Sequence, residues 1–445
     1  MSNAVVNFSV NKGVIKPMHA VNNGPLPPNV RGTSNFDVYK ESGIPFARNH
    51  DAAFHASYGG EHTVDVHRIF KNFDADENDP ASYIFGPTDI CVKSTIDSGT
   101  KVYYRLGAAI EHGLRWGTYP PKDFEKWARI CEHIIAHYTE GWADGFNYDI
   151  EYWEIWNEPD CINPDGSNPC WQGSSELFIE FYEVIAKYLK NRFPNLKIGG
   201  PAFMSPWRDD FKRGFLNNVK ANNVPLDFYS YHCYAKTPKG IYEAAVEADE
   251  ALKEAGLEGT ETILNEWNYV KGWMNDDWKA SVDAWKGLKG SSFITATMSL
   301  CQYGPVDMLM FYEARPCSMC SLFETDRPWV ALKGYYPFKM FNELYKLGGS
   351  VEASSDCEDV FVVAAKDENK AALLLTYFED ETDVLSKEIN IKLSDSEFSK
   401  NVTVKYYLLD NTHDAELVRE EYCEKLEDLK IELQLYSSYL IVLEK

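Results

Sequence analysis

The feature that most constrains this chain is an alternation of short apolar runs with amphipathic stretches, from about residue 14 to residue 347. Such alternation is typical of repeated strand–helix units, in which crossover helices join parallel strands. Eight runs have the length and the β-branched or aromatic content of strands. They are Ile15–Val21, Phe46–His50, Val102–Leu106, Tyr152–Asn157, Lys197–Gly200, Phe228–His232, Thr262–Asn265 and Met308–Phe311.

Helical patterns accompany these strands and carry helix-start signals such as Pro120-Pro121 before Asp123. They lie at Asp37–Ser42, Asp89–Ser98, Asp123–Tyr138, Glu176–Arg192, Phe211–Ala221, Ile241–Ala255, Ser292–Gln302 and Tyr336–Tyr345. Eight strand–helix units over roughly 330 residues match a (β/α)8 TIM barrel, an α/β fold that spans about 250 residues and grows by loop insertion.

Two glutamates end strands of this predicted barrel. Glu158 follows the aromatic run Tyr152–Trp156, and Pro159 stops the strand because proline has no backbone donor. Glu266 follows the apolar run Thr262–Leu264. They belong to the fourth and seventh strands, and barrel active sites lie at the carboxyl ends of the strands. Paired carboxyl groups at that mouth predict glycoside hydrolysis, which needs one proton donor and one nucleophile or base.

The pattern changes after Gly348-Gly349. Acidic turns separate five short strand patterns without long helices between them, which predicts a β-sandwich. They are Val360–Ala364, Ala372–Tyr377, Ile389–Leu393, Val402–Leu409 and Ile431–Leu443. We therefore expect a catalytic barrel over residues 14–347 and an accessory domain over 348–445. Residues 1–13 contain an alternating segment, Val5–Val10, that could add a strand to the second domain.

Charge and cysteine content limit the partners and the compartment. Lys and Arg total 44 against 68 Asp and Glu, a net charge of −24, which repels nucleic acid and anionic membranes. No run approaches the roughly 20 apolar residues of a membrane span, and the first residues do not resemble a secretion signal. The ten scattered cysteines favour reduced thiols and a cytoplasmic location. A bridge between Cys161 and Cys170 is the alternative.

At the two glutamates the sequence resembles a known family. Trp153–Pro159 and Leu264–Asn268 are similar to the acid/base and nucleophile motifs of clan A glycoside hydrolases. The layout is most similar to glycoside hydrolase family 39, the β-xylosidase and α-L-iduronidase family. The resemblance implies a retaining mechanism, with Glu158 as acid/base and Glu266 as nucleophile.

The same resemblance implies the sugar-binding residues. Asn157 would hold the sugar 2-hydroxyl, which requires a break in strict strand alternation because Glu158 is its neighbour. His232 and Tyr234 match the His-x-Tyr of the family and would touch the nucleophile and the sugar. His50 matches a substrate-contacting histidine, although the following Asp51 replaces a usual small residue.

The eighth strand departs from the family pattern. Phe311-Tyr312-Glu313-Ala314-Arg315 stands where family members have a Tyr-Trp pair, so Tyr312 is expected to form the sugar platform. Glu313 and Arg315 are expected to form an ion pair at the rim. A further acid, Glu154, points into the barrel and needs an arginine such as Arg48 or Arg105.

Other motifs favour structural roles. Four histidines between His50 and His67 lack the usual zinc spacings, so we expect no catalytic metal, and nothing indicates a cofactor. Cys317 and Cys320 form a single Cys-x-x-Cys and are expected to be buried or idle thiols. Some of Trp267, Trp273, Trp278 and Trp285 are expected to line a sugar groove, with Trp285 a candidate for helix core.

These observations predict a retaining, exo-acting glycosidase without a metal, with β-xylosidase as the leading activity. An arabinosidase, a β-glucosidase or a related clan A enzyme is the close alternative. A barrel that binds sugar without catalysis and a metal-dependent hydrolase are the other options. The expected partner is an oligosaccharide or small glycoside, and the sequence leaves a homo-oligomer open.

Overall fold

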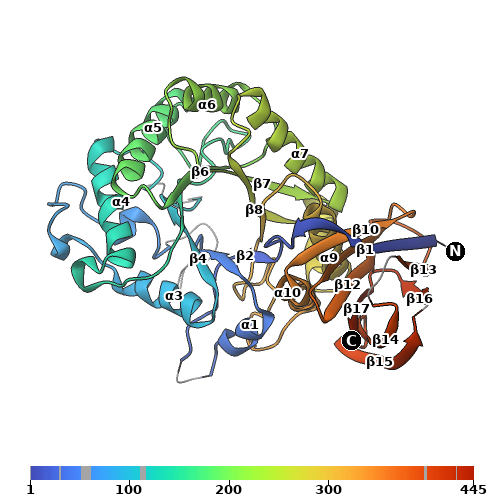
Figure 1. The fold of residues 1–445 in the computed structure, drawn as a ribbon. Helices are drawn as coiled ribbons and strands as arrows, with labels where there is room; N and C mark the ends of the chain where they lie inside the picture. The colour runs from blue at the N-terminus through green and yellow to red at the C-terminus, as the bar shows by residue number, and fades with distance from the viewer. Residues whose placement is uncertain (1, 30–31, 52–61, 111–116, 395–397, 427) are drawn as a thin grey trace.

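The computed structural model describes residues 2–29, 32–51, 62–110, 117–394, 398–426 and 428–445. Figure 1 shows a closed ring of strands surrounded by helices, with a second body of strands beside it that contains both chain termini.

Eight parallel strands close the barrel in the order β2 to β9, which confirms the predicted TIM barrel. They are β2 Ala20–Asn22, β3 Phe46–Arg48, β4 Lys101–Leu106, β5 Tyr152–Ile155, β6 Lys197–Phe203, β7 Phe228–Ala235, β8 Glu261–Tyr269 and β9 Met308–Phe311. The strand expected over Ile15–Val21 was placed too early. The Ile15 amide donates to the Gly348 carbonyl and the Lys16 amide to Gln302 Oε1, so this segment links the two bodies instead.

The described helices pack outside the ring, and the large apolar core lies between them and the strands. They are α1 Phe36–Ser42, α2 Val66–Ile69, α3 Gly86–Asp97, α4 Phe124–Thr139, α5 Ser175–Arg192, α6 Asp210–Ala221, α7 Pro238–Glu254, α8 Asn275–Trp285, α9 Leu288–Gln302 and α10 Tyr336–Leu347, with 3-10 turns at Pro80–Ser82, Trp142–Asp144 and Lys333–Tyr335. Side chains of Asp123 and Ser174 cap α4 and α5, and α4 begins directly after Asp123, as the Pro120-Pro121 signal predicted. In the described part of the chain no helix has the length and apolarity to cross a bilayer.

The second body is a mixed sheet of nine strands in the order β15-β14-β17-β12-β11-β10-β1-β13-β16. They are β1 Ser2–Val14, β10 Gly349–Ser355, β11 Val360–Lys366, β12 Lys370–Tyr377, β13 Ser386–Ser394, β14 Lys400–Leu409, β15 Asp414–Lys425, β16 Leu429–Gln434 and β17 Ser438–Glu444. Side chains from both ends of this sheet, such as Ile389 and Ile441, meet in one core. The sheet thus folds over itself as the predicted β-sandwich.

Two details of the second body differ from the sequence expectation. The run Ile431–Leu443 is two strands, β16 and β17, because the chain turns at Tyr436, whose φ is +65°. β15 was missed because it is an edge strand that is mostly exposed and acidic, so it lacks an apolar pattern.

One face of the sandwich packs on the barrel. Val363 and Leu374 point toward α9 and α10 and belong to the barrel core, whereas their neighbours Val362 and Leu373 fill the sandwich core. β1 pairs with β10 and with β13. This pairing supports the proposed division of the chain at residue 348 with the amino-terminal strand joined to the second domain, which stays a proposal.

Candidate active site

The backbone departs from strand geometry just before Glu158. β5 ends at Ile155, and Trp156 and Glu158 have φ of +80° and +46°. The Trp156 amide donates to the Leu106 carbonyl and the Glu158 amide to the Ala202 carbonyl, so both neighbouring strands hold this conformation. Strict strand alternation is therefore broken here, as the role expected for Asn157 requires, and Asn157 and Glu158 both contact residues inside the barrel mouth.

Glu158 is half-buried and has few polar neighbours. Its Oε1 is 2.7 Å from His232 Nδ1, and its Oε2 accepts a long hydrogen bond from the Cys170 thiol at 3.8 Å. Burial, followed by the negative charge of Asp160, raises the pKa of Glu158 to about 8. This carboxyl group is therefore protonated at neutral pH, as a general acid must be.

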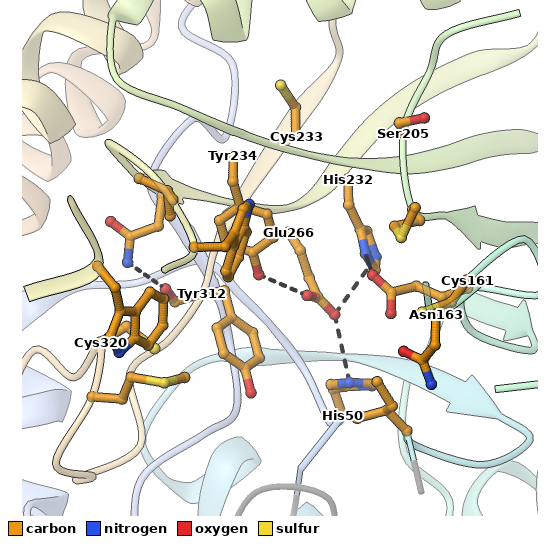
Figure 2. A pocket seen from close by; sticks show the side chains of 18 of the residues that line it. His50, Cys161, Asn163, Ser205, His232, Cys233, Tyr234, Glu266, Tyr312 and Cys320 are labelled. Atoms are coloured by element: carbon orange, nitrogen blue, oxygen red, sulfur yellow. Dashed lines mark hydrogen bonds and ion pairs between the residues drawn. The ribbon is translucent and has the colours of Figure 1, made fainter. Parts of the chain in front are cut away.

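Glu266 on β8 has a more polar setting than Glu158. Its Oε1 lies 2.9 Å from Arg48 Nη1, and its Oε2 accepts a hydrogen bond of 2.8 Å from the Tyr234 hydroxyl. Figure 2 shows Glu266 between Tyr234, His232 and His50. Burial raises the pKa of Glu266, while His232 and Arg48 oppose that rise. The ion pair and the hydroxyl donor favour the ionised form, so the shared proton of the pair belongs on Glu158.

The two carboxyl groups are close together. Ligand atoms of Glu158, His232 and Glu266 all lie within 4.8 Å of one another. Retaining glycosidases hold their carboxyl groups about 5 to 5.5 Å apart, whereas inverting enzymes need about 6.5 to 9.5 Å to admit a water molecule. The separation therefore matches direct attack by one carboxylate.

Arg48 connects the site to the barrel interior. Its guanidinium donates to Glu154 at 2.7 Å, to Glu266 at 2.9 Å, to Asn157 Oδ1 at 2.7 Å and to Asn22 Oδ1 at 3.1 Å. Of the two arginines considered for Glu154, Arg48 is the partner. A fully buried fork with four acceptors fixes the position of the Glu266 carboxylate.

Glu154 needs more than one donor because it is completely buried. The additional donors are Tyr103, Ser230 and Asn265. Sequence reasoning missed this ring, although each of these polar residues interrupts an apolar strand run. Arg105 pairs instead with Asp65 at 2.7 Å.

Four of the five predicted sugar-binding residues line the same pocket. His50, His232, Tyr234 and Tyr312 line one pocket together with Glu158 and Glu266. Asn157 does not line it, since this side chain is buried and its carbonyl oxygen accepts from Arg48. The roles assigned to these residues stay predictions.

The position expected for Glu313 after the eighth strand was wrong. Glu313 and Arg315 form an ion pair of 3.2 Å, but Glu313 is buried instead of lying at the rim. Its carboxylate also accepts from Asn23 at 2.5 Å, and burial raises the pKa of Glu313 well above the ordinary value. The Tyr312 hydroxyl donates to the buried Asp51 carboxylate, so the two unusual residues Asp51 and Tyr312 contact each other.

The pocket has a volume of about 620 Å³ and a largely apolar wall. Three of the four tryptophans considered, Trp273, Trp278 and Trp285, line it. Trp267 is fully buried against Phe311 instead. Trp207 after β6 lines the pocket and was not predicted, because nothing in its local sequence distinguishes it from a surface tryptophan. No lysine or arginine is found among the described lining residues.

Three groups of described side chains bring possible metal ligands within 4.8 Å: Glu158 with Cys161 and Cys170, Glu313 with Cys317 and Cys320, and Glu158 with His232 and Glu266. In the second group a hydrogen bond from Cys320 lowers the pKa of Cys317 to about 6. Of the histidines between His50 and His67, His62 pairs with Asp51, and His55 lies outside the described residues.

Comparison with known proteins agrees with this geometry. The model for glycosyl hydrolases family 39 matches residues 69–283, which include both glutamates. Over this stretch, which is just under half of the chain, the sequence is similar to glycoside hydrolase family 39. It is 30% identical over 155 residues to a β-xylosidase of Geobacillus stearothermophilus, and 27% identical over 162 residues to one of Caldicellulosiruptor saccharolyticus. These matches cover 34% and 36% of this chain but only 28% of each relative.

His50 and Tyr312 lie outside the matched region, so the family match does not bear on the roles predicted for them. Over the whole chain, the fold is similar to that of a glucosidase from Croceicoccus marinus, with a TM-score of 0.81 and 20% identity. That likeness covers 100% of this chain and 99% of the other, and at this identity it shows the fold alone.

Proposed function

We propose that this protein is a retaining glycoside hydrolase. The observation that carries the proposal is the placement of Glu158 just after β5 and of Glu266 in the carboxyl-terminal half of β8, with carboxylate oxygens within 4.8 Å of each other in one pocket. This is the spacing at which one carboxylate attacks the anomeric carbon while the other donates a proton to the leaving group.

Each carboxyl group has the surroundings that its step requires. Glu158 holds a proton at neutral pH and gives it to the glycosidic oxygen. Glu266 attacks the anomeric carbon and forms a covalent glycosyl-enzyme. Glu158, now ionised, then takes a proton from the water that releases the sugar. Arg48 and Tyr234 hold Glu266 in one orientation, which reduces the entropic cost of attack.

We further propose β-xylosidase-like, exo-acting hydrolysis of a small glycoside or oligosaccharide. Two of the curated relatives that match this chain are named β-xylosidases, and a third is named an α-1,4-L-rhamnosidase. The pocket has no lysine or arginine among its described lining residues, which favours a neutral sugar over a uronate. An arabinosidase or β-glucosidase specificity is the alternative within the same mechanism. We also propose a reducing, cytoplasmic compartment, a proposal that the ten unpaired cysteines support.

The test is a panel of nitrophenyl glycosides that begins with β-xyloside and includes α-arabinoside, β-glucoside and a uronide. Wild type is compared with Glu266→Gln and with Glu261→Gln, whose side chain lies at the opposite end of the same strand. We expect one neutral sugar to be released by wild type and by Glu261→Gln only. Equal activity of Glu266→Gln and wild type would exclude Glu266 as the nucleophile.

A further inference from the structure

Two cysteines lie beside the proposed catalytic acid. Cys161, in the loop after β5, is partly exposed and lines the pocket, where Figure 2 shows it near Asn163. Cys170 is fully buried, and its Sγ is 3.8 Å from Glu158 Oε2. The two sulfur atoms and a carboxylate oxygen of Glu158 all lie within 4.8 Å of one another. The mechanism proposed above uses neither thiol.

We propose that Cys161, Cys170 and Glu158 bind a thiophilic divalent cation such as Zn²⁺. A tetrahedral zinc ion has bonds of about 2.3 Å to sulfur and about 2.0–2.2 Å to oxygen, so neighbouring ligand atoms lie roughly 3.5 to 3.8 Å apart. The Cys170–Glu158 separation of 3.8 Å is already close to this range, and the remaining pairs need to close by at most about 1.3 Å. Because Glu158 and Cys161 line the pocket, a water molecule from the pocket would supply the fourth ligand.

Ligand chemistry and charge favour this group over the other two. Thiolates select zinc-like ions and discriminate against Mg²⁺ and Ca²⁺. The group around Glu313 has Arg315 at 3.2 Å, and the group around Glu266 has Arg48 at 2.9 Å, so each holds a cation that repels a metal ion. In the described part of the chain, no lysine or arginine forms an ion pair with Glu158.

Metal binding has a defined proton balance. The cation replaces the thiol protons of Cys161 and Cys170 and the carboxyl proton of Glu158, and these three protons pass to the solvent. A metal-bound Glu158 has no proton to give to a leaving group. The prediction that zinc inhibits the enzyme therefore depends on the proposed glycosidase function. The prediction that the metal ion binds depends only on the three side chains.

Binding is tested by titrating the reduced protein with Cd²⁺ and recording the ultraviolet thiolate-to-metal charge-transfer band. Wild type should bind one Cd²⁺ per chain. Cys161→Ser, Cys170→Ser and Glu158→Gln should each weaken binding by more than the roughly 10- to 100-fold that loss of an outer partner causes. The matched control Cys317→Ser should bind as wild type does. Because Cys161 is partly exposed, its variant tests the site even if Cys170→Ser does not fold.

Inhibition is tested by the ratio of each protein's activity with Zn²⁺ to its own activity in chelator. Wild type should lose activity with Zn²⁺, and Cys161→Ser should retain it. Cd²⁺ affinity unchanged in Cys161→Ser, or a band lost in Cys317→Ser instead, would overturn the site. A protein that binds Cd²⁺ through Cys161 but cleaves no glycoside would leave the metal site standing and contradict the glycosidase proposal.

Discussion

His232 Nδ1 lies 2.7 Å from Glu158 Oε1, and the other ring nitrogen of His232 lies 3.5 Å from Glu266 Oε1. Burial lowers the pKa of His232 to about 4, so the ring is neutral and carries one proton. Because burial raises the pKa of Glu158 to about 8, the Glu158 hydroxyl donates to Nδ1 at neutral pH. The ring proton is then on Nε2 and faces Glu266. The neutral ring of His232 thus accepts a hydrogen bond from protonated Glu158 and presents its own N–H to ionised Glu266.

Activity should fall at alkaline pH because the acid must be protonated. With the pKa of Glu158 at about 8, kcat/KM should decline above pH 8 and approach a tenfold loss per pH unit. The profile is measured from pH 5 to 10 with circular dichroism as a control for folding. Glu158→Gln, assayed on a dinitrophenyl glycoside that needs no acid, should lack this alkaline decline. An unchanged decline would assign it to another group.

Titration of Glu158 should also make the free energy of unfolding depend on pH. Between the ordinary carboxyl pKa of 4.5 and the folded value of about 8, the native state holds more protons than the unfolded state. The free energy of unfolding therefore falls as pH rises through this window. Glu158→Gln does not titrate, so its stability relative to wild type should be higher at pH 9 than at pH 5. Urea unfolding at both pH values measures this, and a pH-independent difference would contradict it.

Removal of the Arg48 charge should strongly destabilise the folded protein. Arg48→Met leaves the buried carboxylates of Glu154 and Glu266 without their cation, and breaking a buried pair in this way costs about 3–5 kcal/mol. The matched control is Lys93→Met, which removes the exposed ion pair with Asp97 and should change stability by less than about 1 kcal/mol. Equal effects in chemical denaturation would mean that Arg48 does not organise the site.

The hydroxyl of Tyr234 should matter for activity and little for folding. Tyr234→Phe removes a donor to Glu266, and a hydrogen bond to a charged group corresponds to about 10- to 100-fold in kcat/KM. Tyr231, three positions earlier on the same strand, has a buried hydroxyl with no partner among the described residues. Tyr231→Phe should therefore keep wild-type activity. Similar losses in both variants would indicate a packing effect.

The sequence predicted the barrel and its two glutamates because local chemistry determines them. Pro159 prevents the strand before Glu158 from continuing past that residue, and an apolar run leads directly into Glu266. The environments of these residues could not be predicted in the same way. The ring of donors around Glu154 comes from four separate strands, and only the closed barrel brings them together.

Burial of charged residues was the main property that the sequence left undetermined. Glu313 and Arg315 are two residues apart on a strand end, a spacing that fits an exposed pair as well as a buried one. Cys161 and Cys170 have no motif spacing, and their proximity to Glu158 depends on how the loop after β5 returns to the barrel. The pocket tryptophan Trp207 likewise comes from a loop without regular structure.

Trapping of the glycosyl-enzyme tests most directly whether Glu266 is the nucleophile. Wild type is incubated with a dinitrophenyl 2-deoxy-2-fluoro-β-xyloside, or with the fluorinated form of whichever sugar the panel selects, and is analysed by intact mass and peptide mapping. We expect a mass increase of one fluorosugar, located on Glu266 and absent from Glu266→Gln. A label on another residue, or turnover with inverted anomeric configuration and no label, would contradict it.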